Sequence, residues 1–143
     1  MNTTVILRSI MTSTARLEER ADGVIVQRVM VTRTQTLTDA RENTAAFARL
    51  AGGRPRPALV DIRIMRAIHT DAREHYVNPE FTTSCSAVAL LVASPGSHQL
   101  SQYYMSQGPH SFKVRQFVDP IEAIAWLREV TAEPTQLGDS APL

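Results

Sequence analysis

Residues 86–93 (SAVALLVA) form a nearly continuous apolar run, and this run most constrains the fold of the 143-residue chain. A strand of this kind normally lies inside a sheet whose two faces are both covered, because alternate side chains point to opposite faces. The run therefore predicts an interior strand of a sheet with helices packed on it.

Elements on either side of this run alternate between strand and helix patterns. Residues 14–20 and 24–31 are predicted strands joined at Asp22 and Gly23, a hairpin signal because both central turn positions need positive φ. A helix is expected from Leu37, with Thr38 as its N-cap, up to Gly52 and Gly53. Further strands are predicted at residues 58–62 and 112–118, and further helices at 70–77, at 97–107 and after Asp119.

The predicted order is β-β-α-β-α-β-α-β-α, which indicates one α/β domain with a mixed, mostly parallel sheet and helices packed on it. We assign this domain to residues 12–130. Residues 1–11 are expected to be a flexible lead-in and residues 131–143 a flexible tail, because chain ends of this composition fray.

Composition excludes several classes of function. A formal net charge of +1 leaves no footprint for nucleic acid, and no stretch reaches the roughly 20 apolar residues of a membrane span. The lone Cys85 excludes an internal disulfide and argues for a cytoplasmic protein without a cysteine-based zinc site. No metal or other cofactor is predicted, because metal-ligand spacing is absent from the four histidines, His69, His75, His98 and His110.

Residues 57–72 (PALVDIRIMRAIHTDA) resemble the strand–loop–helix that carries the phosphorylation site of STAS domains (sulfate transporter and anti-sigma factor antagonist). STAS domains open that helix with Asp-Ser-Ser-Gly, and residues 69–72 align with this motif without gaps. The span 42–127 is also similar to a bacterial family described as STAS/SEC14-like, through LAGG, PALVDIR, AREHY, AVALLV and EAIAWL. The resemblance implies a STAS/SpoIIAA-like fold.

The resemblance also implies a non-enzymatic regulatory or protein-interaction module. Asp71 stands at the phosphoacceptor position, so the usual serine phosphorylation cannot switch this chain. Thr70 is either a phosphoacceptor or the cap of the helix. The predicted interaction surface is His69, Thr70, Asp71 and Arg73, for a protein partner that the sequence does not identify; a homodimer is also plausible.

The alternative function is a SEC14-like carrier of a small molecule or lipid. Asp61 lies at the C-terminal end of the predicted strand 58–62, where α/β sheets present ligands, and is a candidate member of a ligand groove. Tyr103 and Tyr104 are adjacent, so both cannot point into the core in the same way, and with Tyr76 they would form a groove. Cys85 has no His or Asp partner in a recognisable motif, and no catalytic residue is predicted.

Overall fold

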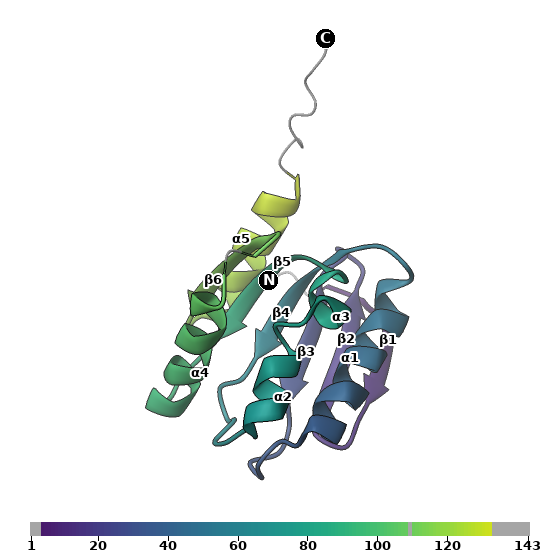
Figure 1. Ribbon diagram of the computed structural model, residues 1–143. Helices are drawn as coiled ribbons and strands as arrows, with labels where there is room; N and C mark the ends of the chain where they lie inside the picture. The colour runs from purple at the N-terminus through teal and green to yellow at the C-terminus, as the bar shows by residue number, and fades with distance from the viewer. Residues whose placement is uncertain (1–3, 109, 133–143) are drawn as a thin grey trace.

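The computed structural model describes residues 4–108 and 110–132, which fold around one mixed β-sheet (Figure 1). The sheet has six strands in the order β1-β2-β3-β4-β5-β6, so neighbours in the sheet are also neighbours in sequence. The first three strands are antiparallel, and β3 to β6 are parallel. The strands are β1 (Ile6–Met11), β2 (Ala15–Arg20), β3 (Ile25–Val29), β4 (Arg56–Asp61), β5 (Cys85–Leu91) and β6 (Lys113–Phe117).

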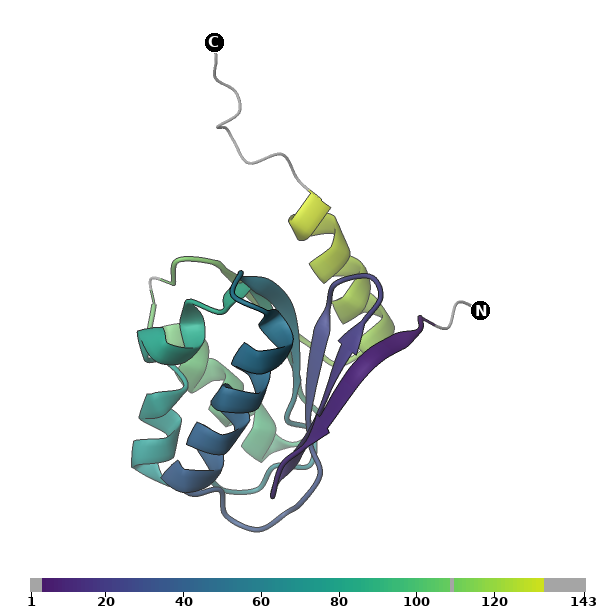
Figure 2. The same ribbon diagram turned by 90° about the vertical axis from the view of Figure 1, so that its right-hand side faces the viewer.

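The helices divide unequally between the two faces of the sheet, as Figure 2 shows. The connection between two neighbouring parallel strands is right-handed. When successive strands are added in one direction across the sheet, every connecting helix therefore lies on the same face. The connecting helices all lie on one face, and the terminal helix packs on the other. The helices are α1 (Leu37–Ala51), α2 (Thr70–His75), α3 (Pro79–Thr82), α4 (Pro95–Ser106) and α5 (Pro120–Ala132).

Strand β5 is the interior strand that the apolar run predicts. Val88 and Leu90 pack toward α1 and α4, whereas Ala87, Ala89 and Leu91 pack toward α5. All five side chains are buried, because helices lie over both faces of this strand. The predicted α/β fold with a mixed, mostly parallel sheet is confirmed.

The N-terminal segment differs from the prediction. Residues 6–11 form the edge strand β1, paired with β2, where the sequence predicted a flexible lead-in. Only Ile10 of this strand packs against the core, so β1 lacks the buried alternation that marks a strand in a sequence. At the other end, α5 extends to Ala132; the rest of the predicted tail lies outside the described residues.

Helix starts also differ from the predictions in detail. The N-cap of α1 is Thr36 rather than Thr38, because Thr36 and Asp39 form a reciprocal capping box. Helix α2 has His69 as its N-cap, so Thr70 is already inside the helix and does not cap it. Of the turn pair after β2, only Gly23 has a positive φ.

The break at Asn78 and Pro79 is observed, but α3 follows it as an unpredicted short helix. Helix α4 begins at Pro95, earlier than predicted, because Pro suits the first turn after the N-cap Ser94. None of the helices in the part of the chain that the structure describes is long and apolar enough to cross a membrane.

Candidate binding cavity between α2 and α4

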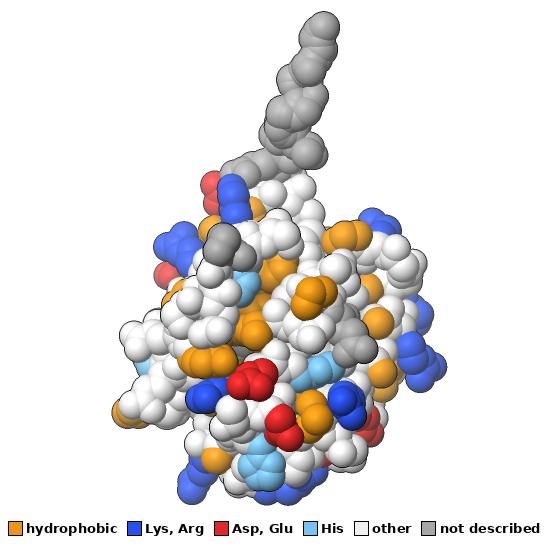
Figure 3. All heavy atoms as spheres, in the orientation of Figure 1, with side chains coloured by type: hydrophobic (Ala, Val, Ile, Leu, Met, Phe, Trp, Pro, Cys, Tyr) orange, Lys and Arg blue, Asp and Glu red, His pale blue; other side chains and the backbone are white. Residues whose placement is uncertain are grey.

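A small cavity lies on the α1–α4 face of the sheet. Helix α2 packs against α1, and α4 packs against β6, so the floor between them is only partly covered. Side chains of β4 and β5, namely Val60, Val88 and Leu90, form part of that floor. Figure 3 shows hydrophobic side chains gathered in the hollow between these helices. The cavity volume is about 70 Å³.

The break between α2 and α3 helps create this space. Proline disfavours a helical conformation in the preceding residue, so α2 ends after only two turns and the chain turns at Asn78 before Pro79. The remaining cavity wall is mostly aliphatic and aromatic. It consists of Val29, Ile62, Met65, Ile68, Tyr76, Phe81, Leu100, Tyr103 and Tyr104, with Gln27, Gln35 and Arg73 as the other polar members.

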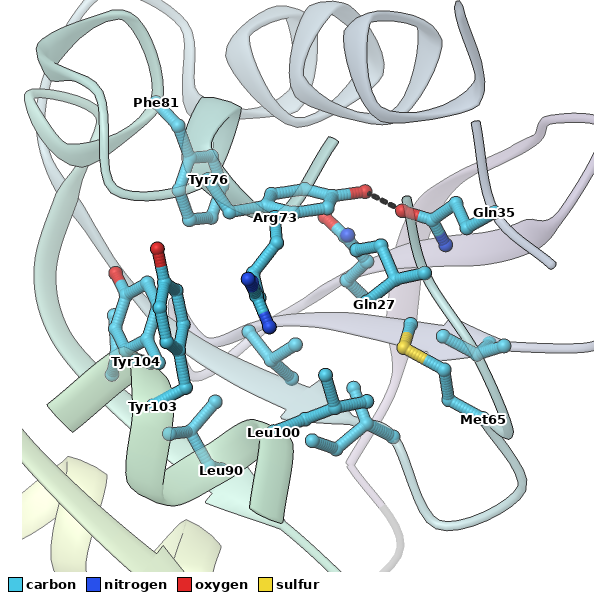
Figure 4. A pocket seen from close by; sticks show the side chains of 15 residues that line it. Gln27, Gln35, Met65, Arg73, Tyr76, Phe81, Leu90, Leu100, Tyr103 and Tyr104 are labelled. Carbon is cyan, nitrogen blue, oxygen red and sulfur yellow. Dashed lines mark hydrogen bonds between the residues drawn. The ribbon is translucent and has the colours of Figure 1, made fainter. Parts of the chain in front are cut away.

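Three polar atoms of residues that line the cavity have no hydrogen-bond partner among the described parts of the chain: Gln27 Oε1, Arg73 Nε and the Tyr104 hydroxyl. Gln27 is only 2% exposed and lies on β3. The Arg73 guanidinium lies over the Tyr103 ring, 4.1 Å from its centroid (Figure 4). A buried polar atom without a partner costs roughly 1–3 kcal/mol, so each of these three atoms requires an explanation, and a bound molecule that pairs with them is one.

Tyr76 is held in the wall by a buried polar network. Its hydroxyl donates to Gln35 Oε1 and accepts a hydrogen bond from Asn43 Nδ2 at 3.2 Å. Asn43 Nδ2 also lies 3.0 Å from Thr14 Oγ1. Burial raises the pKa of the Tyr76 hydroxyl, which therefore remains a neutral donor at physiological pH. The network fixes one end of the cavity in place.

Comparison with known proteins identifies the family. A family described as a domain of unknown function (DUF7793) matches residues 18–131, which is most of the chain. The chain belongs to the DUF7793 family. No curated protein matches it significantly.

A solved structure shares the fold of this DUF7793 domain. It is an uncharacterised protein of the DUF3478 family with a SpoIIAA-like fold, from Shewanella loihica PV-4. The two chains are 15% identical, the TM-score is 0.54, and the match covers 89% of this chain and 97% of the other. The match confirms the predicted SpoIIAA-like fold, and at this identity it shows the fold alone.

Three of the four predicted groove residues line the cavity of the DUF7793 domain. Tyr104 is buried and Tyr103 half-buried, and Figure 4 shows both beside Tyr76 and Arg73. Asp61 does not line it. The rule that placed Asp61 in a ligand site applies where the strand order of a sheet reverses, and this sheet has no such reversal.

Asp61 instead lies between two arginines. Its carboxylate accepts from Arg28 Nε at 3.1 Å and from Arg63 Nη2 at 2.9 Å. Burial by itself would raise the pKa of Asp61, but the hydrogen bonds from Arg63 and Arg28 lower it overall. Asp61 therefore joins β4 and the following loop as a charged carboxylate.

The four residues of the predicted interaction surface do not all lie in the same place. His69, Thr70 and Asp71 are exposed at the start of α2, whereas Arg73 lines the cavity. Gln27 was missed by the sequence prediction, although a signal was present. It is a polar residue at an inward-facing position between Ile25 and Val29 in a strand that otherwise supplies apolar side chains to that face.

The described residues contain one cysteine, Cys85, and its buried position does not activate the thiol. The Cys85 thiol is buried and lies 3.8 Å from the carbonyl oxygen of Phe81. Burial raises the pKa of this thiol to about 12, which makes it a poor nucleophile at neutral pH. Among residues 4–108 and 110–132, no three His, Cys, Asp or Glu side chains gather closely enough to hold a metal ion.

Proposed function

We propose that this DUF7793 domain is a non-enzymatic STAS-like module that binds a small, largely apolar molecule between α2 and α4. The observation that carries the proposal is an apolar cavity whose wall contains unpaired polar atoms. Ligand sites have this composition: an apolar lining gives affinity, and a few polar groups set the orientation of the ligand. The carrier hypothesis is thus better supported than binding of a protein partner.

The size of the cavity limits the ligand. A volume of about 70 Å³ is roughly half that of an engineered cavity that holds benzene. Only a few non-hydrogen atoms fit inside, so the rest of a ligand has to pass between α2 and α4 toward solvent. A short chain or a small ring fits this space, whereas a whole phospholipid does not.

The polar side chains of the cavity wall support a function without catalysis. Its polar side chains are two amides, a guanidinium and three phenols. Burial raises the pKa of Tyr104, as it does that of Tyr76, so both phenols stay protonated. Neither provides the base or nucleophile that a hydrolytic reaction needs at neutral pH.

Titration with 1-hexanol, followed by ¹⁵N–¹H chemical shifts, tests this proposal. We expect saturable shift changes at cavity residues of the wild-type protein. Leu100→Trp should abolish them by filling the cavity, while Gln99→Trp, at an exposed neighbouring position of α4, should not. A wild-type protein that shows no saturable shifts at the cavity would overturn the proposed function.

A protein partner is the second candidate. It is supported by the exposure of His69, Thr70 and Asp71, which together form one corner of the molecule at the start of α2. Thr70 also remains accessible to a kinase there. Pull-down experiments with Asp71→Arg should lose the partner; if Asp71→Arg and Thr70→Ala retain every partner of the wild-type protein, this surface is not the interface.

A further inference from the structure

The unpaired polar atoms in the cavity specify more than an apolar ligand. Arg73 Nε and the Tyr104 hydroxyl can donate hydrogen bonds, and Gln27 Oε1 can only accept one. A ligand that presents an acceptor to Arg73 and a donor to Gln27 therefore pairs with two of these three groups. A plain hydrocarbon would leave all three groups unpaired.

The positive charge of Arg73 further limits the chemical class of the ligand. Arg73 forms no ion pair within the described residues, although six other arginines do. Among the side chains that the structure describes, no aspartate or glutamate lines the cavity, so none of these side chains offsets the positive charge of Arg73 there. The guanidinium is oriented by its stacking on Tyr103, and a planar carboxylate matches such a fork in geometry and charge.

The depths of Arg73 and Gln27 in the cavity determine the order of the acid group and the donor group along the ligand. Arg73 and Tyr103 are half-buried and lie where the cavity opens between α2 and α4 (Figure 4). Gln27 is almost completely buried, on the sheet side of the cavity. The acid group of a ligand thus meets Arg73 near solvent, and its donor meets Gln27 deeper inside, among aliphatic side chains.

We infer that the ligand is a short hydroxy acid, with its carboxylate on Arg73 and its chain hydroxyl donating to Gln27. This inference rests on the proposed function, because it names the ligand class of the same cavity. One carboxylate balances the single cation, and one hydroxyl satisfies the single free acceptor. A cavity with about half the volume of an engineered cavity that holds benzene accommodates about three or four carbons, so the carboxylate and any further carbons lie toward the opening between α2 and α4.

Four kinds of probe test the inference by ¹⁵N–¹H chemical-shift titration: hydroxyhexanoates with the hydroxyl at carbon 2, 3 or 6, hexanoate, hexyl phosphate and 1-hexanol. For the wild-type protein we expect at least one hydroxyhexanoate to bind most tightly. Arg73→Met retains an apolar stem and removes the charge. It should weaken both acids by about tenfold to a hundredfold, as loss of a charged hydrogen bond does, and leave 1-hexanol unchanged.

Two further variants complete the design. Gln27→Met should remove the preference for the hydroxyhexanoate over hexanoate without changing the affinity for hexanoate. Arg49→Met is the matched control, because Arg49 is exposed near the end of α1 and does not line the cavity. It should leave every dissociation constant unchanged. Thermal unfolding of each variant establishes that the cavity is still folded.

The outcomes separate the two proposals. If 1-hexanol binds the cavity but Arg73→Met leaves acid binding unchanged, the proposed function stands and the hydroxy-acid inference is overturned. Equal binding of hexanoate and every hydroxyhexanoate overturns it as well, and so does tighter binding of hexyl phosphate than of the acids. If no probe changes the chemical shifts of the cavity residues, the cavity binds none of these molecules, and both proposals are overturned together.

Discussion

The two faces of the sheet are packed in different ways. On one face, α5 lies directly on β4, β5 and β6, and small residues such as Ala87, Ala89 and Ala123 allow close contact. On the other face, several helices share the cover, and a cavity is left between α2 and α4. On the first face the single helix α5 contacts three neighbouring strands, whereas on the second face α2 has only six residues and leaves a space between itself and α4.

The difference shows which positions can be substituted without destabilising the core of the fold. Residues of the α5 face serve stability, because their buried side chains form one apolar cluster between the helix and the sheet. The aliphatic residues around the cavity already lack some packing partners, so their substitution should cost little stability and should change binding instead. Tyr76 differs from them because its hydroxyl belongs to the buried polar network. Four predictions test this contrast.

Leu127→Ala should produce the largest loss. Leu127 is 0% exposed between α5 and the sheet, and removing a fully buried leucine side chain leaves a hole that close packing cannot fill. We expect the free energy of unfolding to fall by about 2–5 kcal/mol in urea titrations. Ile121→Ala is the control on the same helix, because Ile121 is 78% exposed and should change stability by less than about 0.5 kcal/mol.

Tyr76→Phe should have the next largest effect. It removes the hydroxyl that joins Asn43 and Gln35, so both buried amides lose a partner. The expected loss is about 1–3 kcal/mol, measured by the same titration. Tyr103→Phe, at a half-buried tyrosine of the cavity, should be close to neutral. Equal losses for the two variants would contradict the role of the polar network.

Asp39→Asn should cost about 1 kcal/mol at pH 7, because it weakens the capping box of α1 and the ion pair with Arg33. The hydrogen bond from Arg33 holds the pKa of Asp39 at about 2, against an ordinary value of 3.8. A lowered folded-state pKa gives stability that is present above the unfolded-state pKa and lost as the pH falls through the folded-state pKa.

The stability difference between the wild-type protein and Asp39→Asn should therefore shrink between about pH 4 and pH 2. Urea titrations at several pH values measure it. A difference that stays constant over this range would show that the charge of Asp39 contributes nothing, and that only the geometry of the cap matters.

Leu100→Ala should have the smallest effect. Leu100 is half-buried and borders a cavity that already exists, so its removal enlarges an open space instead of creating a new one in a close-packed layer. We expect a loss below about 1 kcal/mol. A loss as large as that of Leu127→Ala would show that the two faces are equally well packed, and the contrast between them would fail.

Much of the fold could be predicted because periodicity and turn residues are local. The apolar run at 86–93 identified β5, and the break at Asn78 and Pro79 identified the end of α2. The strand β1 was missed because an edge strand buries little of itself. The cap at Thr36 was missed because two threonines, Thr36 and Thr38, satisfy the same local rule.

The candidate site was predictable only in part. The adjacency of Tyr103 and Tyr104 suggested a groove, and the structure places both around the cavity with Tyr76. Asp61 was misplaced because its position depends on the order of strands in the sheet, which is not a local property. Arg73 and Gln27 come from segments far apart in the sequence, so only the fold brings them to one space.

The strand order has a consequence for how the chain folds. Since each strand pairs with the strand that precedes it in sequence, no pairing has to wait for a distant segment, and the longest loop to be closed is a single crossover. Pairing between sequence neighbours keeps these separations shorter than in a sheet whose strands pair out of order, and shorter separations favour faster folding. The sheet can grow from the β2–β3 hairpin toward β6, with α5 closing the open face last.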